Sequence, residues 1–196
     1  MSAGNIVLGI DPGFVALGWT LMALYPDGEN VLAAGVIRTE STHKKRGIRK
    51  CDDQTERSRS IARELRKLVF EPFSKDSALP LVICVESMSL TPKANRAAWH
   101  GMGRVWGVVA ALADFAALPL VQCFPQEAKK AVLGRSNGGK DEIEAALRDR
   151  WGPSLGAKVE HITPSFRNHA FDAMAAVLGC AEADAVQMVR RQGGRL

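Results

Sequence analysis

The sequence predicts an α/β protein built on one mixed, five-stranded sheet in the spatial order 3-2-1-4-5, with helices on both faces. Three apolar, strand-like segments follow one another near the start of the chain, and the turns between them are too short to hold a helix. Strands joined in this way pair antiparallel. Two more apolar segments then alternate with helical patterns, as in right-handed β-α-β units with parallel strands. The fourth strand is therefore expected beside the first.

The first strand and the turn after it organise the rest of the chain. Residues 6–10 form the short apolar run of a buried strand, Asp11 closes that run, and Pro12-Gly13 turns the chain at once. Residues 19–25 return as the second strand, and residues 31–38 form the third. Because a buried carboxylate is costly without a partner, Asp11 at a strand end indicates a nearby cation, for which a metal ion is a common choice.

The remaining elements follow from hydrophobic periodicity and from the positions of proline and glycine. Apolar runs predict strands at 79–85 and 120–124, and the first of these is followed by Glu86. Helical patterns cover 54–70, 95–118, 140–151 and 165–188, and another helix opens at Pro125. Residues 134–139 form a glycine-rich turn, and residues 151–163 are expected to be irregular. Ligands of such sheets bind beyond the carboxyl ends of the strands, where Asp11 and Glu86 both lie.

Length, charge and cysteine content restrict the class of protein. A chain of 196 residues suits one domain, and a formal net charge of +5 favours a polyanionic partner. Four cysteines lie far apart, and Cys84 and Cys123 occupy apolar runs, so buried thiols in a reducing compartment are expected, without a zinc site. The chain has no signal-peptide pattern, and Asp114 and Pro119 interrupt its longest apolar stretch. A cytoplasmic location without a membrane span is therefore expected.

Two segments each allow two interpretations. Residues 39–53 carry a basic run that is either a solvated loop or an arm contacting phosphate. The basic residues singled out in that run are Lys44, Lys45 and Arg46. The helix at 95–118 contains three glycines, which either pack it on its own sheet or allow close contact with a second subunit. These glycines are Gly101, Gly103 and Gly107.

Three acidic residues from separate elements carry the predicted chemistry. Asp11 and Glu86 end two neighbouring strands, and Asp172 lies in the last helix. His169 precedes Asp172 by three residues and shares its helical face. Oxygen ligands without cysteine suit Mg²⁺ or Mn²⁺ rather than zinc. Carboxylates brought together repel one another unless cations lie between them, and two such ions can bridge a phosphodiester and activate a water.

Four segments resemble the RuvC-type Holliday junction resolvases of the ribonuclease H-like superfamily. They read LGIDPGFVALGW, LVICVES, AKKAVLGRSNGGKDEI and NHAFDAMAAVLG, and with the order of elements they cover nearly the whole chain. The resemblance implies one RuvC-like nuclease domain over residues 1–196. It also implies a Mg²⁺-dependent endodeoxyribonuclease with two ions per active site, for which Mn²⁺ can substitute. Such an enzyme resolves four-way DNA junctions by paired nicks in opposing strands.

The resemblance also assigns roles to residues and partners. The catalytic and metal-binding positions that it implies are Asp11, Glu86, His169 and Asp172. Its two DNA-binding lysines match Lys129 and Lys140, and we add Lys130 and the basic run at 44–46 as candidate DNA contacts. A homodimer acting on branched DNA is implied, away from any membrane, in a bacterium or in the host of a phage. A branch-migration motor is a conceivable further partner.

Two departures from the family pattern bear on specificity. Bacterial members place an aromatic wedge three residues after the middle acid, where this chain has Ser89, next to Met88. The basic segment 39–53 is also longer than usual and could take over part of DNA binding. Looser specificity for branched DNA, as in phage-borne relatives, is therefore the main alternative within the family.

Other functions compete with junction resolution. An actin-like ATPase or sugar kinase opens with a similar turn but needs a second lobe, for which 196 residues leave no room. Another ribonuclease H-like nuclease, acting on RNA–DNA hybrids or as a transposase, would keep the same acids, and the motif over residues 129–140 favours the resolvase. A non-catalytic junction-binding protein would need none of the acids.

Overall fold

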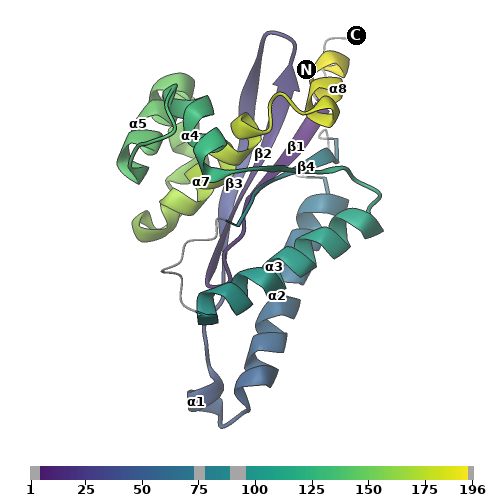
Figure 1. The fold of residues 1–196 in the computed structure, drawn as a ribbon, viewed down its shortest axis with the longest axis vertical. Helices are drawn as coiled ribbons and strands as arrows, with labels where there is room; N and C mark the ends of the chain where they lie inside the picture. Colours follow the sequence, from purple (N-terminus) through teal and green to yellow (C-terminus); the bar gives the residue numbers. More distant parts are fainter. Residues whose placement is uncertain (1–4, 73–77, 89–95, 194–196) are drawn as a thin grey trace.

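A five-stranded mixed sheet forms the centre of the molecule (Figure 1). The computed structural model describes residues 5–72, 78–88 and 96–193. The strands are β1 (Asn5–Asp11), β2 (Ala16–Tyr25), β3 (Gly28–Arg38), β4 (Pro80–Glu86) and β5 (Leu120–Cys123). Their order is β3-β2-β1-β4-β5, with β1, β4 and β5 parallel and with β1–β2 and β2–β3 antiparallel. The predicted sheet is confirmed.

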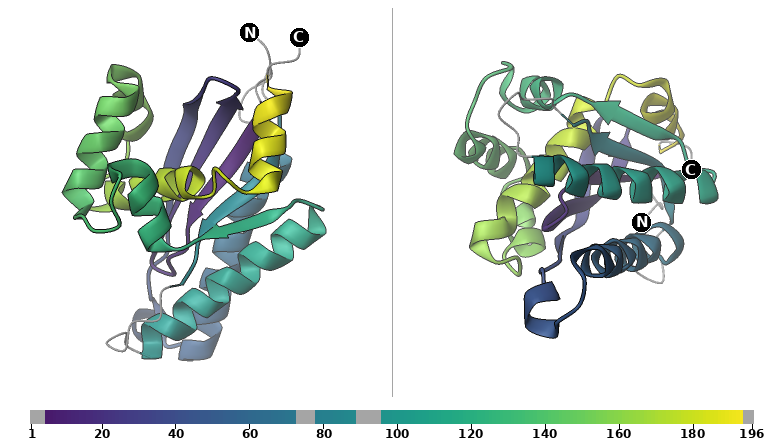
Figure 2. Two further views of the ribbon diagram at one scale, coloured as in Figure 1. Left: turned by 45° about the horizontal axis from the view of Figure 1, so that its top comes forward. Right: turned by 60° about the horizontal axis from the view of Figure 1, so that its bottom comes forward.

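Helices cover both faces of this sheet, as predicted (Figure 2). One face carries α2 (Lys50–Phe70) and α3 (Arg96–Phe115), and the short α1 (His43–Arg46) packs against α2. The helices on the other side are α4 (Pro125–Leu133), α5 (Lys140–Trp151), α6 (Pro153–Val159), α7 (Arg167–Gly179) and α8 (Asp184–Gln192). A 3-10 turn, η1 (Pro164–Phe166), leads into α7, which packs directly on β1 and β2.

The alternation of side chains along β1 explains why its sequence is a continuous apolar run. Ile6, Leu8 and Ile10 pack with α2 and α3 in one core cluster, whereas Val7 packs with α7 in the other. Because both faces are covered, no polar side chain is tolerated between Asn5 and Asp11. The strand ends at Asp11, where the chain emerges from the core.

Several predicted boundaries are wrong, among them the starts of β2 and β3, which begin at Ala16 and Gly28 rather than at 19 and 31. The segment predicted to be irregular contains α6, which Pro153 opens at a favoured helix position. The single helix predicted at 165–188 is interrupted between α7 and α8, because the chain turns after Gly179 to bring α8 back along the start of β1. The helix predicted at 95–118 ends at Phe115. It ends there because Ala117 adopts a left-handed backbone conformation with φ 52°, and the Leu118 amide then donates back to the Ala113 carbonyl at 2.9 Å. Asn95 lies outside the described residues.

The basic segment at 39–53 is more ordered than either interpretation supposed. It contains α1 and the first turn of α2, which begins at Lys50 rather than at Gln54. The buried carboxylate of Asp53 accepts hydrogen bonds from the Thr42 amide at 2.8 Å, the Thr42 hydroxyl at 3.1 Å and the Ser41 hydroxyl at 3.3 Å. One buried acid therefore folds this segment back onto α2.

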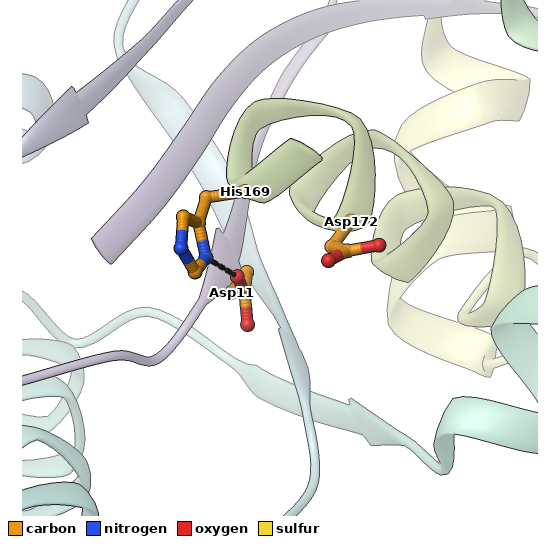
Figure 3. Close-up of side chains that lie close together, drawn as sticks. All are labelled: Asp11, His169 and Asp172. Carbon is orange, nitrogen blue, oxygen red and sulfur yellow. Dashed lines mark hydrogen bonds and ion pairs between the residues drawn. The ribbon is translucent and has the colours of Figure 1, made fainter. Parts of the chain in front are cut away.

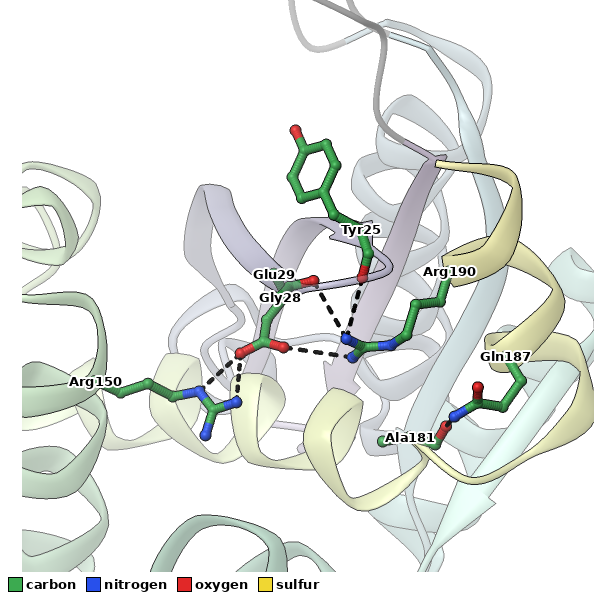
Figure 4. Close-up of polar contacts among 7 residues, drawn as sticks. All are labelled: Tyr25, Gly28, Glu29, Arg150, Ala181, Gln187 and Arg190. Carbon is green, nitrogen blue, oxygen red and sulfur yellow. Dashed lines mark hydrogen bonds and ion pairs between the residues drawn. The ribbon is translucent and has the colours of Figure 1, made fainter. Parts of the chain in front are cut away.

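The turn between β2 and β3 is tied to two helices by a single carboxylate (Figure 4). Glu29, with its side chain 5% exposed, pairs with Arg150 at 2.5 Å and with Arg190 at 3.4 Å. Arg190 also donates to the carbonyls of Tyr25 and Gly28. Because Arg150 lies near the end of α5, this network fixes the far end of the helix that begins at Lys140.

The described cysteines agree with the expectation of buried thiols. Cys84 and Cys123 are buried free thiols, as predicted, and Cys180 is buried with them. Over residues 5–72, 78–88 and 96–193, no helix is long and apolar enough to cross a membrane.

Helix α7 lies so close to the sheet that one strand residue must lack a side chain. A Cβ atom added to Gly18 of β2 would lie within van der Waals overlap of the His169 carbonyl, at 1.9 Å. Gly18 pairs directly with Asp11 in the sheet, so this contact fixes how near His169 comes to Asp11. The close approach of helix and strand is therefore part of the site's construction.

We expect Gly18→Ala to destabilise the protein by about 1–3 kcal/mol or more, because the added methyl forces α7 away from β2. Denaturant unfolding measures this loss. Gly28→Ala is the matched control, since nothing lies within 4 Å of a Cβ added there. Equal stability of the two variants would contradict the close packing of α7.

Candidate active site

The carboxyl ends of two parallel strands bring Asp11 and Glu86 to one edge of the sheet, as predicted. Asp11 is the last residue of β1 and Glu86 is the last residue of the neighbouring β4. Helix α7 crosses the same edge, and its first turns carry His169 and Asp172 (Figure 3). Ala170, Phe171 and Ala173, next to these two residues on α7, are buried and apolar, so these neighbours anchor the helix in the core.

Asp11, His169 and Asp172 form a compact group, which we call the carboxylate–histidine cluster. One potential ligand atom from each residue lies within 4.8 Å of those of the other two. His169 Nδ1 donates to Asp11 Oδ2 at 2.7 Å, since an ionised carboxylate can only accept (Figure 3). In the tautomer that carries its proton on Nδ1, the lone pair of Nε2 can bind a cation or accept a proton.

Glu86 lines the same pocket as the cluster but is not one of its three members. Burial, followed by the charges of Asp11 and Asp172, raises the pKa of Glu86 from 4.5 to about 8. Burial and the charge of Asp11 also raise the pKa of Asp172, although Lys140 opposes this shift. These shifts show that the acids disfavour one another's ionised forms, a condition that a divalent cation relieves. The pocket encloses about 330 Å³ and is lined by Asp11, Glu86, Pro125, Ala128, Lys129, Gly138, Lys140, Ile143, His169, Asp172 and Ala175.

Two lysines enter this pocket from α4 and α5. Lys140 Nζ pairs with Asp172 at 3.3 Å. With its amide oriented to satisfy both neighbours, Asn168 accepts from the same Nζ at 2.6 Å and donates to the Ser165 carbonyl. Lys129 donates to the Gly138 carbonyl at 3.0 Å and so closes the glycine-rich turn. The sequence predicted both lysines as DNA contacts, and the structure places both beside the acids.

Known proteins resemble this chain in sequence. No protein-family model matches it. Crossover junction endodeoxyribonuclease RuvC of Chlorobium phaeobacteroides is 31% identical over 138 residues, which are 70% of this chain and 65% of the relative. The protein of that name from Synechococcus sp. is 29% identical over 144 residues, 73% of this chain and 82% of the relative. The chain is thus similar in sequence to RuvC proteins.

Solved structures agree with this relationship at the level of the fold. Thermus thermophilus RuvC in complex with a Holliday junction substrate has a TM-score of 0.69 at 23% identity and covers 95% of this chain and 98% of its own. The yeast mitochondrial Holliday junction resolvase Ydc2 has a TM-score of 0.60 at 14% identity, covering 96% and 81%. The predicted ribonuclease H-like fold is thus confirmed. The chain spans less than two thirds of the length of the RuvC proteins of C. phaeobacteroides (65%) and C. chlorochromatii (63%).

The donor set of this site fits a hard divalent cation. The cluster offers two carboxylates and an imidazole, and Glu86 adds a third carboxylate to the same pocket. Oxygen-rich sites of this kind suit Mg²⁺ or Mn²⁺, whereas zinc sites commonly include sulfur or several imidazoles. The raised pKa values of Glu86 and Asp172 further indicate that added positive charge would be stabilising here.

Without divalent cations, we expect the free energy of unfolding to fall as the pH rises from about 4.5 to about 8. In that range Glu86 holds its proton in the folded state and loses it in the unfolded state, so rising pH favours unfolding. Thermal unfolding in EDTA across this range measures the effect. In the Glu86→Gln variant the free energy of unfolding should depend less on pH. Added Mg²⁺ should likewise weaken the pH dependence of the native protein. A native protein whose stability rises through this range would contradict the buried position of Glu86.

Sequence reasoning did not find the residues that hold the turn after Asp11. The Arg57 guanidinium of α2 lies 4.1 Å from the centre of the Phe14 ring and donates to the Phe14 carbonyl at 3.3 Å. It also donates to Thr39 Oγ1 at 2.9 Å, and that hydroxyl donates to the Phe14 carbonyl at 2.5 Å. Phe14 in turn lies against Gly101 of α3. Nothing in the spacing of an arginine on α2 reveals a partner so distant in sequence.

Three of the other predicted DNA contacts, Lys130, Lys45 and Arg46, do not line the pocket. Lys130 is exposed on α4, and Lys45 and Arg46 are exposed on α1. The side chain of Lys44 and the whole of Ser89, the position of the family's aromatic wedge, lie outside the described residues. Arg46 lines a separate groove with Arg57 and Arg63. These positions stay predictions.

Proposed function

We propose that the chain is a metal-dependent, structure-specific endonuclease that resolves four-way DNA junctions by paired nicks in opposing strands. The observation that carries this proposal is the carboxylate–histidine cluster, which a strand end and a helix build beneath a pocket that also holds Glu86 and two lysines. The relatives named crossover junction endodeoxyribonuclease support the same activity for a chain with this fold.

We propose Asp11, Glu86, His169 and Asp172 as the catalytic and metal-binding residues, with Mg²⁺ as the cofactor, two ions per site, and Mn²⁺ as a substitute. When bound, such ions polarise a phosphodiester and lower the pKa of a water molecule. Asp11 also accepts a hydrogen bond from His169, so we propose that it both binds the cation and orients the imidazole. Asp172 pairs with Lys140, and the same Lys140 ammonium also donates to Asn168.

His169 has one free lone pair, on Nε2, and we propose that it either completes the coordination shell of an ion or accepts a proton from the attacking water. Its Nδ1 is engaged by Asp11, which fixes the ring and leaves Nε2 as the free basic atom. A neutral base held in one orientation is the arrangement that general-base catalysis requires. Lys140 places its positive charge beside Asp172, where it would also meet the phosphate of a bound strand.

The proposed DNA contacts are Lys129, Lys130 and Lys140 near the pocket, and Lys44, Lys45 and Arg46 on α1. Together they would follow the phosphate backbone from the glycine-rich turn to the basic segment. We also propose a homodimer, because paired nicks in opposing strands need two sites related by a two-fold axis. Gly103 and Gly107 of α3 have open space where a Cβ would be, whereas Gly101 is occupied in packing against Phe14. Light scattering with and without junction DNA measures the oligomeric state.

A cleavage assay across substrates tests the proposed function. Four-way junction, flap, duplex and RNA–DNA hybrid are each incubated with the protein in Mg²⁺. The four-way junction should be cut fastest, and its two opposing strands should be nicked to the same extent. Preferential cleavage of the hybrid would instead assign the chain to another class of ribonuclease H-like nuclease. Tight junction binding without any cleavage would assign it to non-catalytic junction binding.

We expect Lys140→Ala to weaken junction binding and to reduce the slope of log affinity against log salt by about one. The reason is that each phosphate neutralised by a lysine releases about one condensed counterion. Gel shifts in Ca²⁺ at several salt concentrations measure the slope. Lys67→Ala removes an exposed lysine paired with Glu64 on α2 and should leave the slope unchanged. An unaltered slope in Lys140→Ala would exclude this lysine from the DNA contacts.

A further inference from the structure

A second pocket lies at the outer edge of the sheet, apart from the one that holds the acids. It encloses about 260 Å³, and the lining residues that matter here are Trp19, Gly35, Val36, Arg38, His161 and Phe166. None of these six residues lines the pocket of the carboxylate–histidine cluster. The strand that borders the second pocket is β3, which is the edge strand of the sheet (Figure 1). The catalytic proposal does not use this pocket.

Two aromatic side chains line it from opposite faces of the sheet, since Trp19 packs against the α2–α3 core cluster and Phe166 against the α7 cluster. The Trp19 indole lies across Gly35, where an added Cβ would approach the ring to 2.6 Å, so a residue without a side chain is needed at that position. The Arg38 guanidinium lies 4.2 Å from the centre of the Phe166 ring. Both rings are half-buried, and the Arg38 side chain is 47% exposed. Aromatic faces beside a guanidinium are the combination on which nucleobases stack.

The sheet register places this pocket near the acids. Asp11 pairs with Gly18 on β2, and Gly18 pairs with Val36 on β3. Two steps between strands, about 4.8 Å each, put Val36 roughly 10 Å from Asp11. Stacked nucleotides rise about 3.4 Å each, so this distance corresponds to about three nucleotides. Phe166 also precedes His169 by three residues, at the end of η1.

Charge in the pocket favours a polyanion that carries bases. Arg38 has one ion-pair partner among the described residues, Glu40 at 3.6 Å, and both side chains are exposed. An exposed pair of this kind contributes little to stability, so a phosphate can replace Glu40 at small cost. His161 lies on the rim as a second group able to donate to phosphate.

We propose that the pocket between Trp19 and Phe166 binds one unstacked base of the cut strand, a few nucleotides from the scissile phosphate, with Arg38 contacting its phosphate. This inference rests on the proposed function, and it adds a site that would make cleavage depend on local unstacking. Bases at a junction or another disrupted position cost less to unstack than bases within a duplex. The pocket would therefore help to select branched DNA.

Abasic junctions test the proposal without altering the protein. Each nucleotide flanking the mapped cleavage point is made abasic in turn, and binding is measured by gel shift in Ca²⁺. Wild-type protein should lose roughly 5- to 150-fold in affinity at one position and little elsewhere. The Trp19→Ala variant should bind the intact junction more weakly than wild type by a similar factor. Making that one position abasic should then cause no further loss of affinity in this variant. Trp151→Ala, which removes another half-buried indole at the end of α5, should keep the wild-type position dependence.

A second variant keeps the test decisive if Trp19→Ala fails to fold. Phe166→Leu preserves apolar volume but removes the ring, and it should show the same loss and the same insensitivity to the abasic position. Wild-type protein that binds every abasic junction equally well would overturn the proposal. Additive losses from the abasic position and from either variant would overturn it too, because base and ring would then act separately. A wild-type protein that binds or cuts no junction would overturn the proposed function instead.

Discussion

Asp11→Asn should lower the single-turnover rate of junction cleavage by at least about 10³-fold while leaving junction affinity unchanged or slightly higher. The amide keeps the shape of the side chain but loses the charge that binds a cation. It also removes one negative charge from a pocket that must receive phosphate. The same change removes one of the charges that raise the pKa of Glu86, so the folded protein should not be destabilised.

Cleavage in Mg²⁺, gel shifts in Ca²⁺ and thermal unfolding measure the three parts of this expectation. Asp27→Asn is the matched control, since Asp27 is an exposed acid in the turn between β2 and β3. Near wild-type cleavage by Asp11→Asn would show that the metal-site assignment is wrong. Loss of binding and of stability together would show that Asp11 supports the fold rather than the chemistry.

His169→Ala should lower the cleavage rate by roughly 10²–10⁴-fold, which is the usual cost of losing a positioned general base. His169→Asn separates the two roles that the structure gives this residue. An asparagine amide can donate to Asp11 in place of Nδ1, but it offers no nitrogen able to accept a proton. If proton transfer is the important role, the two variants should be similarly slow.

Rates for both variants are measured at saturating Mg²⁺ over a range of pH, beside the wild-type protein. If His169→Asn cleaves as fast as wild type at every pH, the role of His169 is to orient Asp11 and not to transfer a proton.

The sheet and the convergence of the acids could be predicted because they depend on local signals. An apolar run bounded by a carboxylate and a Pro-Gly turn defines β1 and Asp11, and a similar run defines β4 and Glu86. The order of elements then leaves few topologies, and parallel neighbours bring their carboxyl ends together. The spacing of His169 and Asp172 on one helix completes the set.

The details of the site could not be predicted because they depend on contacts between distant residues. Lys140 was expected on DNA, yet its position beside Asp172 depends on how α5 packs against α7. The break between α7 and α8 follows from the need to cover the start of β1, which no local pattern records. Arg57 and Glu29 act through partners on other elements, so residue type alone carried no signal for them.

Mapping the nicks that the native protein makes in a synthetic four-way junction tests the central proposal most directly. In Mg²⁺, two nicks should appear at symmetric positions in opposing strands, and they should disappear in EDTA and in the Asp11→Asn variant. Nicks that persist without divalent cations, or that fall equally on linear duplex DNA, would contradict a metal-dependent junction resolvase built on Asp11, His169 and Asp172.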